Sequence, residues 1–291
     1  MIETAPARRS LWQRQRWLTL RRSSQLAILG LFLIGPWFDI WWAKGNLAAS
    51  LWFDTIPLTD PMIVVQSFVA LGEVTATALV GAVLVAGFYV MVGGRVFCSW
   101  VCPVNIITDA AHWTRQRLRI PPGWRPHPAL RMWLLAMCVA TSAWTGTIVW
   151  ELVNPVTLVQ RGIVFGLGFG WIIIASIFLF DVVVSRRGWC GHLCPVGAFY
   201  GILGVASPVR IAAVAREACS DCGDCFEVCP EPQVITPALR GVDQSTRVIV
   251  ARDCTNCGRC IDVCPDEVFR FAWRYGAEPT VATPERTNKP S

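Results

Sequence analysis

Two copies of one cysteine run near the C-terminus constrain this chain more than any other feature. Each run has the spacing Cys-x2-Cys-x2-Cys-x3-Cys-Pro, and both copies are complete. In this pattern the first three cysteines bind one iron–sulfur cluster and the fourth binds the other cluster of the pair. The sequence therefore predicts two [4Fe–4S] clusters in one small domain. The expected ligands are Cys219, Cys222, Cys225 and Cys264 for the first cluster, and Cys254, Cys257, Cys260 and Cys229 for the second.

Zinc binding and disulfide bonding fit these runs less well. Structural zinc sites use paired cysteine or histidine ligands, not three evenly spaced cysteines and a fourth. Disulfide frameworks are typical of short secreted chains, whereas this chain has 291 residues and long apolar stretches. The sequence has no Gly-rich phosphate loop, Ser–His–Asp pattern or zinc-protease motif, and no catalytic residue is assigned. We therefore expect electron transport.

The composition is typical of a membrane protein, with 54% hydrophobic and 16% charged residues. Stretches of about 20 apolar residues are candidates for transmembrane helices. We therefore expect a mainly α membrane protein with four transmembrane helices, followed by a small α+β ferredoxin-like domain. The apolar stretches lie near Leu26–Trp42, Val74–Val92, Met132–Trp150 and Ile163–Val184.

The arginines indicate an orientation in the membrane. The first 25 residues contain six arginines and one acid, Glu3, and the region between the second and third apolar stretches is also basic. Basic segments stay on the cytoplasmic side of a membrane. We therefore attribute the formal net charge of +6 to the orientation of the chain in the membrane and not to nucleic-acid binding. We expect a multi-pass protein of the bacterial inner membrane with both termini in the cytoplasm.

A second cysteine motif, Cys-x3-Cys-Pro, occurs twice and marks an internal repeat. One copy follows Arg95 and the other follows Arg187, each at the end of an apolar stretch. Two parallel repeats about an axis along the membrane normal would bring both motifs to one side. The four thiolates could then form a third metal or redox centre, or each pair could be a redox-active dithiol. Alternatively, the cysteines could be packing residues in the protein interior. The cysteines concerned are Cys98, Cys102, Cys190 and Cys194.

The chain divides into four parts on these grounds. We expect a basic cytoplasmic N-terminal segment at residues 1–25 and a four-span membrane domain with the two Cys-x3-Cys-Pro motifs at residues 26–210. Residues 211–275 are expected to form the two-cluster ferredoxin-like domain. The polar, aromatic-free residues 276–291 are expected to form a disordered tail.

Several segments resemble the NapH-type ferredoxin-like membrane proteins, of which MauN is a close relative. They include Phe53-Asp-Thr-Ile-Pro-Leu-Thr-Asp-Pro, Phe97-Cys-Ser-Trp-Val-Cys-Pro, Gly188-Trp-Cys-Gly-His-Leu-Cys-Pro-Val-Gly-Ala and Cys225-Phe-Glu-Val-Cys-Pro-Glu-Pro. The resemblance covers roughly residues 11–275. It carries the eight cluster ligands and the four Cys-x3-Cys-Pro cysteines over to the positions named above.

The resemblance implies the quinol dehydrogenase membrane component of the periplasmic nitrate reductase system. Electrons would come from quinol and pass toward the periplasmic reductase. The implied partners are the lipid bilayer, quinol, a NapG-type periplasmic iron–sulfur protein and a NapC-type multihaem cytochrome, with no nucleic acid. Methylamine utilisation is the alternative pathway. Two further hypotheses are a copper-handling or assembly factor for a respiratory enzyme, and a redox-sensing membrane scaffold.

Overall fold

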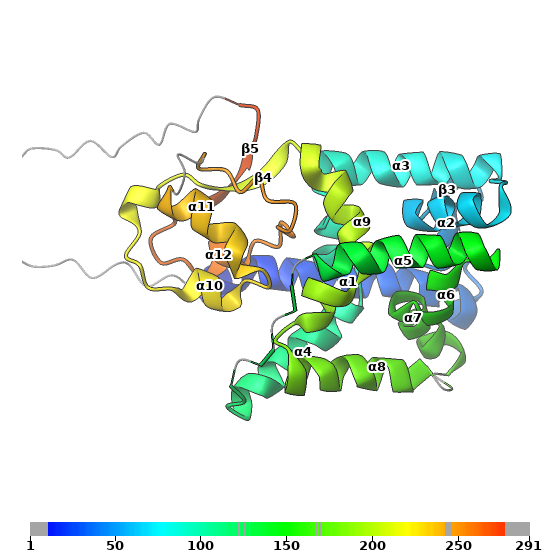
Figure 1. The fold of residues 1–291 in the computed structure, drawn as a ribbon, viewed down its shortest axis with the longest axis horizontal. Coiled ribbons are helices and arrows are strands. Elements are labelled where there is room, and N and C mark those ends of the chain that lie inside the picture. Colours follow the sequence, from blue (N-terminus) through cyan, green and yellow to red (C-terminus); the bar gives the residue numbers. More distant parts are fainter. Residues whose placement is uncertain are drawn as a thin grey trace, which may run out of the picture.

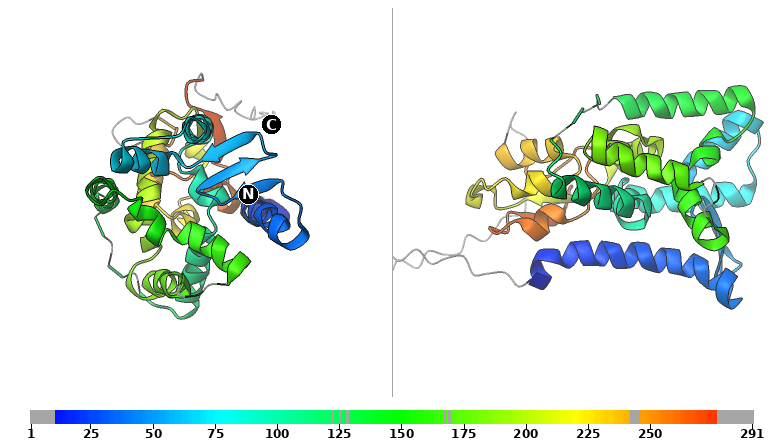
Figure 2. Two further views of the ribbon diagram at one scale, coloured as in Figure 1. Left: turned by 90° about the vertical axis from the view of Figure 1, so that its right-hand side faces the viewer. Right: turned by 90° about the horizontal axis from the view of Figure 1, so that it is seen from below.

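The computed structural model describes residues 11–121, 123, 124, 126, 127, 129–166, 168, 170–241 and 246–276. The described chain is elongated, with a helical part at one end and a smaller α+β part at the other (Figure 1). Helix α1 runs lengthwise along one side and reaches both parts (Figure 2). The expected tail, residues 276–291, lies outside the described residues except for Gly276.

The helical part also carries a small sheet. The sheet is antiparallel in the order β1-β2-β3, with Ala43 opposite Trp52 and Ala49 opposite Thr59. The strands are β1 (Ala43–Gly45), β2 (Ala49–Trp52) and β3 (Ile56–Thr59). The α-helices are α1 (Leu11–Phe38), α2 (Pro61–Leu71), α3 (Ala76–Val92), α4 (Val104–Arg117), α5 (Leu130–Thr145), α6 (Val149–Val153), α7 (Pro155–Phe165), α8 (Gly170–Leu179) and α9 (Pro195–Leu203).

Three π-helical turns interrupt these helices. They are η1 (Phe97–Val101), η2 (Phe180–Val184) and η3 (Trp189–Leu193). Turns η1 and η3 contain the first cysteine of each Cys-x3-Cys-Pro motif, and the second cysteine ends the turn. The backbone N–H of Cys102 donates to Phe97 O at 3.0 Å, and that of Cys194 donates to Trp189 O at 2.9 Å. The residue before a proline avoids helical geometry, so both turns stop at the same place in the motif.

The sequence repeat is also present as matched helix starts. Asp60 caps α2 by accepting a hydrogen bond from Met62 N, and Asn154 caps α7 by accepting one from Val156 N. A proline occupies the first helical position after each cap, where its missing N–H is harmless. A buried glutamine, Gln66 or Gln160, follows in each helix.

The α+β part is built on two antiparallel strands, β4 (Val209–Ala213) and β5 (Phe269–Trp273). Its α-helices are α10 (Asp224–Val228), α11 (Ile235–Arg240) and α12 (Arg259–Val263), and its short 3-10 turns are η5 (Arg216–Ala218) and η6 (Pro232–Val234). A third turn, η4 (Gly204–Ala206), joins it to the helical part. Its core joins β-branched residues such as Ile211 and Ile249 to buried cysteines. The expectation of a ferredoxin-like α+β unit fits this arrangement.

Left-handed glycines start two of these helices. Gly223 has φ 84° and precedes α10, and Gly258 has φ 73° and precedes α12. A side chain at this φ is strained. In addition, a Cβ on Gly258 would lie 2.6 Å from the ring of Trp17. Each glycine directly follows a cysteine, so it turns the cysteine loop sharply into the helix.

The expected fold with four transmembrane helices is wrong. Across the residues that the structure describes, no helix has both the length and the apolar character needed to cross a membrane. A spanning helix needs about 20 apolar residues. Helix α3 has 17 residues, α5 has 16 and α8 has 10. Helix α1 has 28 residues, but arginines occupy its first half.

The cellular location is a separate matter. The apolar stretches and the flanking arginines predict the bacterial inner membrane and cytoplasmic termini, and no structural observation tests this location. It stays a prediction, as do the four domain boundaries.

Candidate functional site

The four cysteines expected around the first cluster lie together. Cys219, Cys222, Cys225 and Cys264 line one small cavity, beside Phe269 of β5. Cys225 and Cys264 are buried, whereas Cys222 is exposed. Burial raises the pKa of the Cys225 thiol to about 11, and the neighbouring cysteines add to the rise. Binding of iron would provide the positive charge that such thiols need in order to deprotonate.

The four cysteines expected around the second cluster line another small cavity. These are Cys229, Cys254, Cys257 and Cys260. The pairing of one C-terminal cysteine of each run with the other run is therefore present in the geometry. Burial raises the pKa of most of these thiols, and the pKa of Cys260 lies well above its usual value. Cys257 differs: burial raises its pKa, but the charges of Arg21 and Arg259, together with hydrogen bonds from the Arg259 backbone and the Thr255 side chain, lower it below its usual value.

The two Cys-x3-Cys-Pro motifs meet inside the helical part. Burial and the neighbouring thiols Cys102, Cys194 and Cys98 raise the pKa of Cys190 well above its usual value. Burial and Cys98 raise the pKa of Cys194 to about 12. The structure thus brings these four thiols within electrostatic reach of one another, and we call them the four-thiol group. Within the described residues, no three Cys, His, Asp or Glu side chains form a site for a single metal ion.

The second cysteine cavity is tied to the four-thiol group by two arginines. Arg95 and Arg187 occupy the same place in the repeat, three residues before Cys98 and Cys190. Arg95 Nη1 pairs with Glu231 Oε1 at 2.9 Å, and Glu231 follows Cys229-Pro230 in the chain. Arg95 Nη2 donates to the backbone O of Cys190 at 2.8 Å. These contacts join one cysteine of each site through a single buried side chain.

Arg187 makes the equivalent connection from the second repeat. Its Nη1 donates to Val228 O at 2.7 Å, directly before Cys229. From the first motif, Ser99 Oγ donates to Thr255 O at 2.8 Å and Trp100 Nε1 donates to Asn256 O at 3.2 Å. The loop between Cys254 and Cys257 is therefore held directly against the first Cys-x3-Cys-Pro motif.

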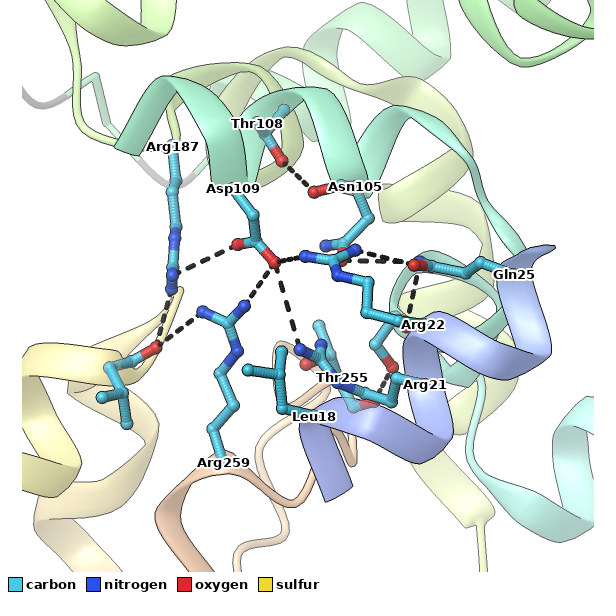
Figure 3. Close-up of polar contacts among 12 residues, drawn as sticks. Leu18, Arg21, Arg22, Gln25, Asn105, Thr108, Asp109, Arg187, Thr255 and Arg259 are labelled. Atoms are coloured by element: carbon cyan, nitrogen blue, oxygen red, sulfur yellow. Dashed lines mark hydrogen bonds and ion pairs between the residues drawn. The ribbon is translucent and has the colours of Figure 1, made fainter. Parts of the chain in front are cut away.

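A cluster of arginines surrounds Asp109 between the two sites (Figure 3). Among the described residues, four guanidinium groups lie within ion-pair distance of this one carboxylate. Arg187 Nη2 lies 3.3 Å from Asp109 Oδ1, and Arg22 and Arg259 also bind the carboxylate. Burial opposes ionisation of Asp109, but the arginines lower its pKa below its usual value.

Excess positive charge therefore lies beside the thiols. Arg21, Arg95, Arg187 and Arg259 line one small cavity with Cys98 and Cys190. A buried positive charge is costly without a negative partner. An anionic iron–sulfur cluster ligated by thiolates is such a partner, so the donor set and the surrounding charge both fit this cofactor. The sequence pattern linked Arg21, Arg95 and Arg187 to membrane orientation, used Arg95 and Arg187 also to mark the repeat, and gave no role to Arg259. The matching positions of Arg95 and Arg187 in the repeat were the signal that could have revealed them.

The comparisons with known proteins agree with this chemistry. A family profile described as a 4Fe-4S dicluster domain matches residues 205–268, and a second, described as a 4Fe-4S binding domain, matches residues 74–121 and 167–211. The chain is 51% identical over 270 residues to the methylamine utilization ferredoxin-type protein MauN of Paracoccus denitrificans (93% of this chain, 95% of the relative). The chain belongs to the NapH and MauN family of ferredoxin-type proteins.

Two further relatives support this membership. The chain is 47% identical over 268 residues to the ferredoxin-type protein NapH of Escherichia coli (91% of this chain, 92% of the relative). It is 50% identical over 235 residues to MauN of Methylorubrum extorquens (81% and 82%). No solved structure matches the chain. The expected resemblance is confirmed, and the chain is a ferredoxin-type 4Fe–4S electron-transfer protein.

Proposed function

We propose that this chain takes electrons from quinol and passes them toward a periplasmic reductase. The observation that carries the proposal is the pair of cysteine cavities, one with an exposed member and the other held against the four-thiol group. A [4Fe–4S] cluster accepts and donates one electron at a time. Two bound clusters would let the chain separate the two electrons of a quinol.

The residues have distinct parts in this proposal. Cys219, Cys222, Cys225 and Cys264 would hold the cluster nearer the surface. Cys229, Cys254, Cys257 and Cys260 would hold the inner cluster. Arg95 and Arg187 fix the inner cysteine loop against the helical part, and the arginines around Asp109 supply positive charge beside it. The exposed Cys222 makes the cavity that it lines the natural contact for a protein electron partner.

A third iron–sulfur centre in the four-thiol group is part of the proposal. Cys98, Cys102, Cys190 and Cys194 influence one another electrostatically. The profile that spans both of their motifs is described as a 4Fe-4S binding domain. The excess arginine charge beside Cys98 and Cys190 suits an anionic centre there.

Quinol oxidation is tested on protein purified without oxygen. Two clusters reduced by a soluble quinol analogue, followed by EPR, are the expected result. Clusters that are reduced by dithionite but never by the quinol analogue would refute quinol as the electron donor.

The number of centres is tested by iron and sulfide analysis. The intact chain is expected to bind about twelve iron atoms, and a Cys98→Ser/Cys190→Ser variant about eight, since each [4Fe–4S] cluster holds four. Cys138→Ser is the control, because Cys138 accepts a hydrogen bond from Gln66 and lies outside the three cysteine sets. Eight iron atoms in all three proteins would refute the proposal of a third iron–sulfur centre. Stoichiometric copper at the four-thiol group would favour a role in metal handling instead.

The proposed pathway follows from the similarity of the chain to its NapH and MauN relatives. We propose a NapG-type iron–sulfur protein and a NapC-type cytochrome as partners in nitrate respiration. The MauN relative is 51% identical and the NapH relative 47%, so methylamine utilisation is the second candidate. Deleting the gene and measuring growth with nitrate as electron acceptor, or with methylamine as substrate, separates the two. A defect confined to methylamine growth would overturn the nitrate assignment.

A further inference from the structure

A large apolar cavity lies between the helical part and the α+β part. Its volume is about 750 Å³, and its walls come from α1, the small sheet, α3 and η1, with Asn256 and Phe271 from the α+β part. Ligand pockets usually have volumes of about 300–1,000 Å³, apolar walls and a few placed polar groups. The cavity is thus large enough for a ring compound with part of an apolar tail.

Asp60 and Tyr200 form a buried polar pair in the wall of this cavity. Tyr200 Oη donates a hydrogen bond to Asp60 Oδ1 at 3.4 Å. The exposed fractions of Asp60 and Tyr200 are 7% and 1%. Burial raises the pKa of Asp60 to about 6, and the carboxylate of Glu151 adds to the rise. This carboxyl group can therefore be ionised at neutral pH while lying in an apolar wall.

Aromatic rings connect this polar pair to the four-thiol group. Tyr200 stacks on Phe97 with ring centroids 4.8 Å apart and planes 11° apart. Tyr89 meets both rings edge-on, at 5.0 Å from Tyr200 and 5.9 Å from Phe97. Phe97 directly precedes Cys98 in the chain. A molecule beside Tyr200 would therefore be separated from the four-thiol group by one layer of side chains.

The other end of the cavity reaches the inner cluster loop. Asn256 lies between Cys254 and Cys257, and its Nδ2 donates to Val92 O at 3.2 Å and Val209 O at 2.9 Å. Trp17 lines the cavity beside it and packs against Phe271 with ring centroids 4.7 Å apart. One cavity thus borders both buried cysteine sites.

We propose that this cavity binds the ring of an isoprenoid quinol, with the Asp60–Tyr200 pair at one ring hydroxyl. The apolar tail leaves past Leu84 and Phe88 on α3, which line the cavity and are 48% and 57% exposed. A quinol matches the site because it joins a flat ring and polar oxygens to an apolar tail. The assignment rests on the proposed function, which names quinol as donor.

The test compares two substitutions on one helix. Val85 lines the cavity, whereas Val83 lies two residues away on α3, is 63% exposed and does not line it. Val85→Trp fills the cavity, and Val83→Trp is the matched control. Full-length protein with its clusters is titrated with a short-tailed quinone analogue, and quenching of tryptophan fluorescence is measured. Because the substitutions themselves add tryptophan, competition by a non-quenching quinol analogue is measured as well.

The expected result is weaker binding by about tenfold or more in Val85→Trp and parent affinity in Val83→Trp. Asp60→Asn and Tyr200→Phe keep the side-chain shapes and are expected to weaken binding by about three- to tenfold, the effect of losing one hydrogen bond. Iron content and EPR spectra of all variants must equal those of the parent, which shows that the fold and the clusters are intact.

The outcomes separate this inference from the proposed function. Equal affinity in the Val85 and Val83 variants, with clusters still reduced by quinol, would overturn the cavity assignment and leave the proposed function standing. Parent protein that neither binds the analogue nor is reduced by quinol would overturn both. Binding that Val85→Trp abolishes, without any reduction of the clusters by quinol, would support the cavity and overturn quinol as the electron donor.

Discussion

At the scale of single residues, the clearest feature of this protein is the buried positive charge around Asp109. Buried arginines outnumber the acids beside them at Asp109, where four guanidinium groups share one carboxylate among the described residues. Arg21 lies close enough to Cys257 for each to shift the pKa of the other. These arginines favour the more negative state of a nearby cofactor. They would therefore raise the reduction potential of a cluster bound in the second cysteine cavity.

The arginine cluster predicts opposite shifts for two variants. Arg21→Gln removes a positive charge and should lower the potential of the inner cluster, while Asp109→Asn should raise it. A charge interaction of about 1–2 kcal/mol in a partly polar interior corresponds to roughly 40–90 mV for one electron. A redox titration followed by EPR measures the shift. Arg14→Gln on the exposed part of α1 is the control, and shifts of one sign in both test variants would contradict the electrostatic account.

Asp60 predicts a dependence of stability on pH. Burial raises its pKa from 3.8 to about 6, so between these values the folded chain binds more protons than the unfolded chain. Its contribution to the free energy of unfolding therefore falls as pH rises from about 4 to 6 and stays low above 6. Asp60→Asn avoids burying the charge and should be more stable by up to about 3 kcal/mol at pH 8.

The stability test for Asp60 is the midpoint of thermal unfolding at pH 4.5 and at pH 8. The advantage of Asp60→Asn should shrink at the lower pH, where the parent carboxyl group is mostly protonated. An advantage that grows on acidification would show that the carboxyl pKa is not raised. Asp54→Asn, at an exposed carboxylate on the small sheet's turn, is the control. A group kept at a cost to stability is consistent with a role in binding.

At the scale of elements, the Cys-x3-Cys-Pro motif acts as a helix-ending device. Each copy forms a π turn that ends at its second cysteine, since the following proline excludes helical geometry there. The two matched turns bring their thiols within electrostatic reach of one another. Close backbone contacts complete the arrangement, because Gly94 packs directly against Gly204 of η4. The position of the four thiols thus depends on backbone geometry as much as on the cysteines.

Two glycine substitutions test this packing. A Cβ on Gly94 would lie 1.7 Å from Tyr200 O and 2.5 Å from Gly204 N, which are backbone atoms that cannot move alone. Gly94→Ala should therefore destabilise the fold by several kcal/mol. Gly87 on α3 has no atom within 4 Å of an added Cβ, so Gly87→Ala should stabilise by about 0.5–1 kcal/mol. Thermal unfolding measures both, and equal effects would contradict the close approach.

At the scale of the whole molecule, the α+β part is held to the helical part by buried ion pairs. Glu231 Oε1 binds Arg95 Nη1 at 2.9 Å and Arg131 Nη1 at 3.0 Å, and Arg131 also binds Asp253. Arg95 and Arg131 come from the helical part, while Glu231 and Asp253 flank the cysteines of the inner cluster. The cysteines proposed to hold the inner cluster therefore lie at the junction, where both halves of the molecule determine their surroundings.

The ion pairs at the junction predict that replacing the Glu231 carboxylate lowers the stability of the protein strongly. Glu231→Gln leaves two buried guanidinium groups short of negative charge, which should cost about 3–5 kcal/mol. We expect earlier thermal loss of the inner-cluster EPR signal than of the outer-cluster signal. Glu217→Gln, at an exposed carboxylate paired with Arg247, should leave both signals unchanged. Equal loss of both clusters in Glu231→Gln would argue that the junction does not stabilise the inner site selectively.

The sequence by itself determined the chemistry of the chain. Cysteine spacing indicates cluster ligands in the two C-terminal runs because the reach of each thiolate is set by local chain geometry. The repeated Cys-x3-Cys-Pro motif predicted four cysteines on one side of the fold and left three roles open for them, a third centre, redox dithiols or packing. Family membership also followed from segments around these cysteines. The partition of eight cysteines into two crossed sets is visible in the spacing and reappears as two cavities.

Only the tertiary structure decided where helices end and which distant groups meet. Hydropathy depends on composition and does not show where a helix ends. Helix α3 has 17 residues because it begins after the Thr75 cap and ends before Gly93, and α5 ends at left-handed Gly146. Arginines that the sequence pattern linked to membrane orientation converge on Asp109 from α1 and the segment before η3, and Arg259 of α12 joins them there. Such convergence depends on long-range packing, which local patterns do not contain. The Asp60–Tyr200 pair and its cavity arise from the same cause.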